Sequence, residues 1–426
     1  MKVFFDTIGC RLNQSEIEHM AAQARLNGHE VVADAAQADM VIINTCAVTL
    51  AASADSRKKI RQAARQGTAR IVTTGCYATI APDELQAIPG VEWNFSNFEK
   101  DEIIERVLGG SPEGGVFIPR EALPGKQHRT RAFIKVQDGC DNLCTFCLTR
   151  LARGSSRSQT KVEIFEDIQA AIEGGVKEIV LTGVNLGAWG RDLVGSPRLP
   201  SLIKEIISEF TPARLRLSSL EPWDISEDFF EVLQLPGFCR HLHLPLQSGA
   251  ARTLKRMGRR NTPAEFGALV EKVRAIVPEI ALTTDIMVGF PGESAADFEE
   301  SLAFVASMNF AGGHVFSYSL RPGTAAEKLP GRVSAADKKN RSRSMRAIFD
   351  LTSAEYRQKF IGRTENVLWE KAVQENALWV MEGLTDTYLR VSAQAQEDFN
   401  NYISQVEFRE EKDQKLNGVI KPGKMM

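Results

Sequence analysis

Strands and helices alternate along most of this chain, and this alternation constrains its fold more than any other feature of the sequence. In residues 1–110, each apolar stretch typical of a strand is followed by a helical pattern. The predicted strands are Lys2–Ile8, Met40–Asn44 and Arg70–Thr74, and the predicted helices are Ser15–Leu26, Ser53–Gln66 and Pro82–Ile88. This order predicts an α/β fold that begins with a doubly wound parallel sheet.

A second strand–helix series begins at Ala132. Its predicted strands are Ala132–Gln137, Glu178–Thr182, Arg214–Ser218, His241–Leu246, Ala281–Val288 and His314–Ser319, with amphipathic helices between them such as Val162–Glu173, Leu199–Phe210 and Ala264–Val277. Six βα units are too few for a closed eight-stranded barrel. The series therefore predicts a partial, open (β/α)6 barrel.

The C-terminal part changes character after a charged helix predicted over Ala335–Phe360. Short strands follow at Asn366–Trp369, Leu378–Met381, Tyr388–Val391 and Tyr402–Phe408. They indicate a small antiparallel β-barrel. Because Gly109–Gly115 and Pro119–Gly125 are rich in Gly and Pro, they mark a linker, and we expect three domains over residues 1–115, 126–358 and 360–426.

Three cysteines, Cys140, Cys144 and Cys147, form a C-x3-C-x2-C run directly after the first strand of the second series. A turn of small buried residues or part of a zinc site is the alternative. However, structural zinc takes four protein ligands, and the nearest histidine, His128, precedes the strand. A [4Fe–4S] cluster that is bound by three thiolates keeps one iron without a protein ligand. The loop also follows the C-terminal end of a barrel strand, which is where barrel enzymes place their active sites. We therefore predict a cluster here.

Cys10, Cys46 and Cys76 each close an apolar strand of the first series, in FFDTIGC, MVIINTC and RIVTTGC. The C-terminal ends of parallel strands lie on one edge of the sheet, where open α/β sheets bind ligands. Buried structural thiols remain the alternative to a second cluster. Cys239 has no cysteine partner at a recognisable spacing and is predicted to be structural. His241 and His243 share a strand face and are interpreted as packing or substrate contacts.

Composition excludes several classes of protein. The formal net charge is −2 over 426 residues, so any nucleic acid must be bound by local basic clusters rather than by bulk charge. A membrane span needs roughly 18 consecutive apolar residues, which the sequence lacks, and the N-terminus does not resemble a signal peptide. Seven cysteines without a dense disulfide framework favour a reducing cytosol. We expect a cytoplasmic protein that does not enter a membrane.

The cysteine loop CDNLCTFC is similar to the motif of the radical-SAM superfamily. Over nearly its whole length the chain resembles the methylthiotransferases, in TIGCRLNQSE, INTCAVT, TTGCYA, the ARG block at Ala152–Gly154, LTGVNLGAWG, LRLSSLEP, LPLQSG, LKRM, DIMVGFPGE, FSYSLRPGT and EGLTDTYLRV. The last resembles the family's small RNA-binding, TRAM-like barrel. TIGCRLNQSE and LTGVNLGAWG look most like the branch that modifies N6-threonylcarbamoyladenosine beside the tRNA anticodon. The other branches act on isopentenyladenosine, or on an aspartyl residue of a ribosomal protein.

The resemblance implies two [4Fe–4S] clusters, S-adenosylmethionine, tRNA and a low-potential electron donor such as flavodoxin or ferredoxin. It assigns radical generation from S-adenosylmethionine to the cluster of Cys140, Cys144 and Cys147. The resulting radical would take hydrogen from C2 of the adenine, and the cluster of Cys10, Cys46 and Cys76 would present the sulfur. S-adenosylmethionine should lie across the strand ends, and its candidate contacts are Phe146, Thr182, Gly183, Glu221 and Gln247.

Local basic clusters are the candidate tRNA contacts. Arg57, Lys58, Arg61 and Arg65 recur at helical spacing after Cys46 and are the main prediction. Further clusters are Lys255, Arg256, Arg259 and Arg260, and Lys338, Lys339, Arg341, Arg343 and Arg346. Solvated helix faces are the commoner role of such clusters. Residues 360–426 hold 8 Lys+Arg against 11 Asp+Glu, so the terminal barrel would bind RNA through a small surface or through Trp369 and Trp379.

Overall fold

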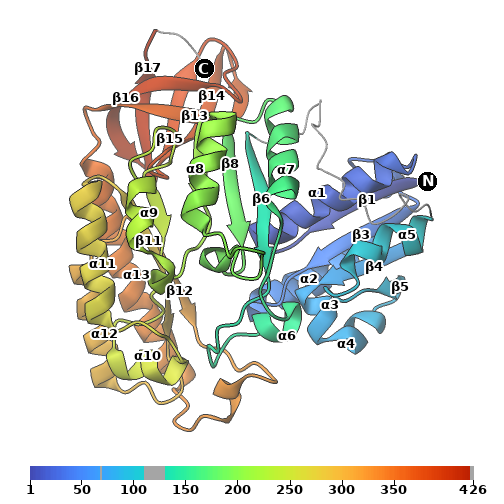
Figure 1. Cartoon of the computed structure of the whole chain (residues 1–426), viewed down its shortest axis with the longest axis horizontal. Helices are drawn as coiled ribbons and strands as arrows, with labels where there is room; N and C mark the ends of the chain where they lie inside the picture. Colours follow the sequence, from blue (N-terminus) through green and yellow to red (C-terminus); the bar gives the residue numbers. More distant parts are fainter. Residues whose placement is uncertain (68–69, 110–129, 423–426) are drawn as a thin grey trace.

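The computed structural model describes residues 1–67, 70–109 and 130–422. Three parts lie against one another, with the N-terminal sheet and the C-terminal barrel each bordering the central barrel (Figure 1). The predicted linker segments Gly109–Gly115 and Pro119–Gly125 lie outside the described residues, apart from Gly109. Within the described ranges, no helix is long and apolar enough to cross a membrane.

The N-terminal part is a five-stranded parallel sheet in the order β2-β1-β3-β4-β5. Its strands are β1 Lys2–Thr7, β2 Glu30–Val31, β3 Met40–Thr45, β4 Arg70–Gly75 and β5 Val91–Asn94. Its helices are α1 Arg11–Leu26, η1 Ala35–Gln37, α2 Leu50–Arg65, α3 Cys76–Ile80, α4 Pro82–Gln86, η2 Lys100–Glu102 and α5 Ile103–Leu108. The predicted doubly wound sheet is confirmed. The edge strands β2 and β5 were not predicted, because they are too short to show a clear pattern.

The ends of two helices in this sheet place cysteines. α1 begins at Arg11, four residues before the predicted start, so that Cys10 is its N-cap. α2 begins at Leu50 because the side chain of Thr49 accepts a hydrogen bond from Ala52 N (3.0 Å) and caps the helix. Both helices therefore start close to the C-terminal ends of their strands.

The central part is a curved parallel array in the order β6-β8-β9-β10-β11-β12, where a Ser219–His243 bridge joins β9 to β10. Its strands are β6 Arg131–Asp138, β8 Glu178–Gly183, β9 Arg214–Leu217, β10 His241–His243, β11 Ala281–Val288 and β12 Gly312–Ser317; the short antiparallel β7 Arg157–Ser158 flanks β6. The predicted partial six-stranded barrel is confirmed. β10 is shorter than expected because Pro245 has no N–H to donate to the ladder.

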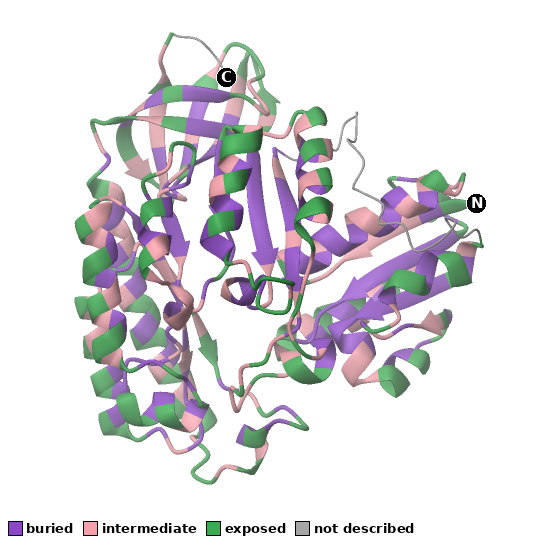
Figure 2. Cartoon of the chain, viewed as in Figure 1, coloured by how far each residue is buried: buried purple, intermediate pink, exposed green. Residues whose placement is uncertain are grey.

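Helices cover the outer face of the barrel and bury its main hydrophobic core (Figures 1 and 2). The helices of the central part are α6 Thr149–Arg153, α7 Lys161–Glu173, η3 Leu186–Ala188, α8 Leu199–Phe210, η4 Pro222–Asp224, α9 Glu227–Val232, α10 Ala251–Met257, α11 Pro263–Ile276, α12 Ala295–Ser307, η5 Ala325–Lys328 and α13 Ala335–Gln358. The α6 helix instead packs against α3 of the N-terminal part, and its Ala152 belongs to the core of that part. The Thr160–Glu163 capping box fixes the start of α7. α1 of the N-terminal sheet lies along β6, where Lys135 N donates to Ser15 Oγ (3.3 Å).

The C-terminal part is a closed barrel in the order β13-β14-β15-β17-β16. Its strands are β13 Thr364–Glu375, β14 Leu378–Thr385, β15 Arg390–Ala395, β16 Ile403–Lys412 and β17 Lys415–Ile420. The predicted small barrel is confirmed, with a fifth strand and one parallel pair, β15–β17. Trp369 is 0% exposed and donates through Nε1 to Ser404 Oγ (2.8 Å), so its predicted role in stacking on RNA is wrong.

Two buried arginines dock this small barrel onto the N-terminal ends of the central strands. Arg214 donates to Leu384 O (2.8 Å) and Asn366 O (2.7 Å). Arg216 donates to Thr385 O (3.1 Å) and forms a bidentate pair with Glu178 (2.7 and 3.0 Å). Because Arg216 and Glu178 side chains are both 0% exposed, each is the charge partner that the other needs.

Glu178→Ala leaves the Arg216 guanidinium buried without its carboxylate. We expect the free energy of unfolding to fall by about 3 to 5 kcal/mol, the usual cost of breaking a buried pair. Urea titrations of the iron-free protein, followed by tryptophan fluorescence, measure this change. Glu231→Ala is the control, since its ion pair with Lys204 is exposed and contributes about 1 kcal/mol or less. Equal losses in the two variants would contradict the prediction.

Candidate active site

The cysteine loop of the central barrel follows β6, whose last residue is Asp138. Gly139 has a φ of +67°, and a Cβ there would lie 1.9 Å from Ser155 O, so only glycine fits this turn. Cys140 N then donates to Gly154 O (3.1 Å), which closes the base of the loop. The far side is held by Thr145, whose N donates to Met257 O (2.9 Å). The loop is thus fixed at both ends.

An N–H donor lies close to each of the three cysteine sulfurs of this loop. Asn142 N lies 3.4 Å from Cys140 Sγ, and Thr149 N lies 3.4 Å from Cys147 Sγ. Arg259 Nη1 lies 3.9 Å from Cys144 Sγ. Such donors stabilise thiolates that bind iron–sulfur clusters. The side chains present therefore fit the cluster that the spacing predicts.

The five predicted contacts of S-adenosylmethionine lie in this loop, at the C-terminal end of β8, or beyond the C-terminal ends of β9 and β10. Thr182 and Gly183 end β8, and Gln247 follows β10 with a φ of +72°. Phe146 meets Phe290 edge-to-face with ring centroids 6.3 Å apart. Glu221 follows β9, and its two carboxylate oxygens accept from Arg259 Nη1 (3.0 Å) and Nη2 (2.7 Å).

Arg259 therefore joins Glu221 to the Cys144 side of the loop. Its guanidinium also donates to Pro245 O (2.5 Å) and lies 4.4 Å from the ring centroid of Trp223. Since Arg259 is buried, its assignment to an exposed basic face is wrong. Sequence spacing could not reveal this role, because Glu221 and Arg259 meet only when two barrel loops come together.

The structure brings Cys10, Cys46 and Cys76 to one edge of the N-terminal sheet, after the neighbouring strands β1, β3 and β4. A Cβ on Gly9, the residue before Cys10, would lie 2.6 Å from Cys46 Sγ. Cys10 Sγ donates to Asn13 Oδ1 (3.5 Å), while Cys76 Sγ accepts from Asn97 Nδ2 (3.6 Å). The predicted convergence of these thiols is confirmed.

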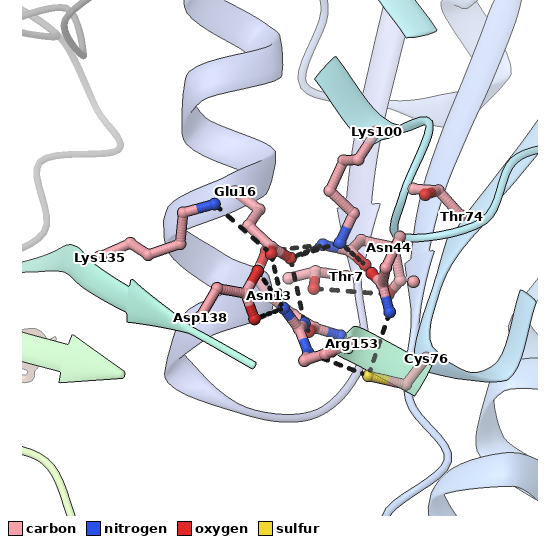
Figure 3. A network of polar contacts seen from close by, with 12 residues as sticks. Thr7, Asn13, Glu16, Asn44, Thr74, Cys76, Lys100, Lys135, Asp138 and Arg153 are labelled. Carbon is pink, nitrogen blue, oxygen red and sulfur yellow. Dashed lines mark hydrogen bonds and ion pairs between the residues drawn. The ribbon is translucent and has the colours of Figure 1, made fainter. Parts of the chain in front are cut away.

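Arg153, the last residue of α6, links the two cysteine groups. Its Nε lies 3.2 Å from Cys76 Sγ, and its Nη1 donates to Asp138 Oδ1 (2.9 Å) at the end of β6 (Figure 3). The ARG block at Ala152–Gly154 is part of the family resemblance, but it suggested no role for Arg153. No local pattern marks this buried arginine, because its partners Cys76, Glu16 and Asn13 come from the N-terminal part.

Burial raises the pKa of four thiols in the two cysteine groups. It raises the pKa of Cys46 and Cys140 to about 11. Burial also raises the pKa of Cys10 and Cys144, against the opposing effect of Arg153 and Arg259 respectively. Metal binding must therefore displace protons from these sulfurs. Within the described residues, no three His, Cys, Asp or Glu side chains are arranged to hold a metal ion by themselves.

Imidazoles line the inner face of the barrel near β10, β11 and β12. His243 Nε2 and His314 Nδ1 each lie 3.3 Å from an oxygen of Asp285. Burial raises the pKa of Asp285, but hydrogen bonds to the two imidazoles outweigh it and hold that pKa below its usual range. The hydrogen bond with Asp285 raises the pKa of His314, whose side chain is 74% exposed. Arg11 reaches the same region and donates to Tyr388 OH (2.7 Å).

The predicted basic face of α2 is only partly confirmed. Lys58, Arg61 and Arg65 are exposed. Arg57 is half-buried, hydrogen-bonded to Tyr77 OH and 3.6 Å from Glu84 Oε2. Arg57 is thus engaged in a contact within the domain, and three residues of the predicted four remain as a surface.

Comparison with known proteins connects these sites to a family. Residues 2–95 match the Uncharacterized protein family UPF0004, and residues 134–305 match the Radical SAM superfamily. A radical S-adenosylmethionine methyltransferase, TsrM from Kitasatospora setae, has the same fold with a TM-score of 0.58, at 15% identity over 76% of this chain and 75% of that one. The match therefore extends beyond the barrel.

Curated relatives align over almost the entire chain. Threonylcarbamoyladenosine tRNA methylthiotransferase MtaB of Thermotoga maritima is 38% identical over 91% of this chain and 90% of its own length. The MtaB protein of Bacillus subtilis is 34% identical, covering 95% and 93%. The tRNA-2-methylthio-N(6)-dimethylallyladenosine synthase of Cereibacter sphaeroides is 35% identical, covering 87% and 88%. With both cysteine groups in place and relatives of this similarity, the chain belongs to the radical-SAM tRNA methylthiotransferase family.

Proposed function

We propose that this chain installs a methylthio group at C2 of N6-threonylcarbamoyladenosine next to the anticodon of tRNA. The observation that carries the proposal is the pairing of two three-cysteine groups, one after β6 and one at the edge of the N-terminal sheet, across a single arginine. In a methylthiotransferase one group serves radical generation and the other serves sulfur transfer. Isopentenyladenosine and a ribosomal aspartyl residue are the alternative substrates.

Two [4Fe–4S] clusters would be held by the six cysteines, one by Cys140, Cys144 and Cys147 and the other by Cys10, Cys46 and Cys76. When bound, they supply the electron that cleaves S-adenosylmethionine and the sulfur for transfer, chemistry that no side chain offers. Low-potential electrons would come from a flavodoxin or a ferredoxin in the cytoplasm. The contribution of the chain is geometry: it must hold the adenine between the two groups.

The residues of the barrel rim would position S-adenosylmethionine. Gln137 fixes the loops around Thr182 and Gly183, since its Nε2 donates to Gly139 O (2.8 Å) and its Oε1 accepts from Asn185 N (2.8 Å). Glu221 retains lone pairs beyond those used by Arg259 and can accept from the amino group or ribose of the cofactor. Phe146 and Gln247 would complete the contacts.

Polar groups inside the barrel support a threonylcarbamoyl substrate. This substituent carries a carboxylate and a hydroxyl group, whereas the dimethylallyl group of the alternative substrate is wholly apolar. Arg11, His243 and His314 offer cationic or hydrogen-bonding partners on the inner face. An apolar dimethylallyl group would instead displace water from these polar groups without replacing its hydrogen bonds.

The experiment that tests the substrate uses two anticodon-stem RNAs, one with threonylcarbamoyladenosine and one with isopentenyladenosine. Reconstituted enzyme, S-adenosylmethionine and a reductant are incubated with each, and the nucleosides are analysed by mass spectrometry. We expect a methylthio product from the threonylcarbamoyl RNA alone. Product from the isopentenyl RNA alone would replace this proposal by the alternative. No product from either RNA, together with S-adenosylmethionine cleavage, would favour the ribosomal substrate.

The exposed basic side chains of α2 would bind phosphates of the tRNA. Charge reversal of Lys58, Arg61 and Arg65 to Glu should reduce the slope of log affinity against log salt by about 3 units, because three phosphate contacts are lost. Filter-binding titrations at several salt concentrations measure the slope. A second variant reverses Lys339, Arg343 and Arg346, the exposed residues of the other candidate cluster on α13, and shows whether that cluster also contacts phosphates. A slope in the α2 variant equal to that of the native chain would return α2 to the role of a solvated face.

A further inference from the structure

A buried network of charged and amide side chains fills the contact between the N-terminal sheet and the central barrel (Figure 3). Arg153 and Glu16 lie at its centre, and both side chains are 2% exposed. Arg153 Nη1 lies 2.8 Å from Glu16 Oε1, and Lys100 Nζ lies 2.6 Å from Glu16 Oε2. The members are Asn13, Glu16, Asn44, Lys100, Lys135, Asp138 and Arg153.

The guanidinium of Arg153 has no freedom to turn. Nη1 is shared between Glu16 and Asp138, and Nη2 donates to Asn13 Oδ1 (2.7 Å). Because the donors of a guanidinium form a rigid planar fork, these contacts also fix the direction of Nε. Nε is thereby aimed at Cys76 Sγ, 3.2 Å away.

The charges of this network do not cancel. Arg153, Lys100 and Lys135 carry three positive charges, whereas Glu16 and Asp138 carry two negative ones. A buried excess of positive charge is costly unless an anion compensates for it. The sulfur that Arg153 Nε faces is the group positioned to do so.

Arg153 also belongs to the cysteine loop of the barrel. It ends α6, which begins at Thr149, two residues after Cys147, and it binds Asp138, two residues before Cys140. A second contact runs in parallel, since Asn97 Nδ2 donates both to Cys76 Sγ (3.6 Å) and to Ala152 O (2.8 Å). The sulfur of Cys76 is therefore hydrogen-bonded to Arg153, in the segment that directly follows the barrel loop.

We propose that Arg153 is a positioning residue that joins the two cysteine sites and, through its hydrogen bond to Cys76 Sγ, raises the reduction potential of the [4Fe–4S] cluster held by Cys10, Cys46 and Cys76. The inference rests on the proposed two-cluster function. Hydrogen bonds to cluster sulfurs and nearby positive charge stabilise the reduced, more negative state. Removing them makes reduction harder.

The test uses the full chain with Cys140, Cys144 and Cys147 replaced by Ala, so that one cluster remains. Its midpoint potential is measured by dithionite titration followed by electron paramagnetic resonance. In this background, Arg153→Gln should lower the equilibrium constant for reduction at least tenfold, equivalent to about 59 mV for one electron. Arg153→Lys keeps the positive charge but not the planar guanidinium, so it should recover part of the lost equilibrium constant for reduction. If the Gln variant does not bind iron, the Lys variant alone is compared with the background protein.

The matched control is Arg259→Gln, a similarly buried arginine beside the barrel loop, which should leave the potential unchanged. An unchanged midpoint potential in Arg153→Gln would overturn the inference. If only Arg153→Lys binds iron, an unchanged potential in that variant would overturn it. An equal fall in the potential of the Arg259→Gln control would also overturn it. A different result bears on the proposed function instead: if the background protein binds no iron at all, the second cluster itself is wrong.

Discussion

Replacing Cys140, Cys144 and Cys147 together by Ala should abolish cleavage of S-adenosylmethionine and halve the bound iron. Two cubane clusters should give about eight iron atoms per chain after anaerobic reconstitution, and one should give about four. The loss of activity is complete because side chains cannot generate the radical that the reaction needs. Iron analysis and chromatography of deoxyadenosine measure the two effects.

The control for this triple variant is Cys239→Ala. Cys239 is buried beside Glu178, with Sγ 3.9 Å from Glu178 Oε2, and lies outside both cysteine groups. This variant should keep about eight iron atoms and its activity. A full iron load in the triple variant would show that these three cysteines do not bind a cluster.

Replacing Cys10, Cys46 and Cys76 by Ala should give the complementary result: S-adenosylmethionine is still cleaved, but no thiolated nucleoside forms. The barrel loop is fixed by its own contacts with Gly154 and Met257, so it does not depend on these thiols for its shape. In the proposed function, the sulfur of the product comes from the site of Cys10, Cys46 and Cys76. Parallel assays of deoxyadenosine and of nucleosides by mass spectrometry separate the two activities.

One outcome would contradict the assignment of radical generation to one cysteine site and of sulfur transfer to the other. A folded variant that keeps about four iron atoms yet cleaves no S-adenosylmethionine would show that the two sites do not work separately. Arg153 is the residue through which such dependence would arise, because it contacts Cys76 and Asp138 at once. The same measurement in Arg153→Lys would then locate the coupling.

The sequence alone determined the architecture. Periodicity of two in strands and 3.6 in helices is a local property, so the parallel sheet, the six-unit barrel and α13 could be predicted, with element ends that differ by a few residues, as at the start of α1. The six cysteines could also be assigned to two groups, because the ends of parallel strands meet at one edge whatever the details of packing. The short edge strands β2 and β5 were not predicted, since a few residues carry too little pattern, and β17 of the closed barrel was also missed.

Only the tertiary structure decided which polar side chains are exposed and which are buried. Arg57 and Arg259 stood in basic clusters in the sequence, yet one binds Tyr77 and the other Glu221. Trp369 was an RNA candidate and is a core residue. Arg153 lies 77 residues from Cys76 and 137 from Glu16. Its environment exists only after two domains pack together, and no local pattern encodes a contact of that range.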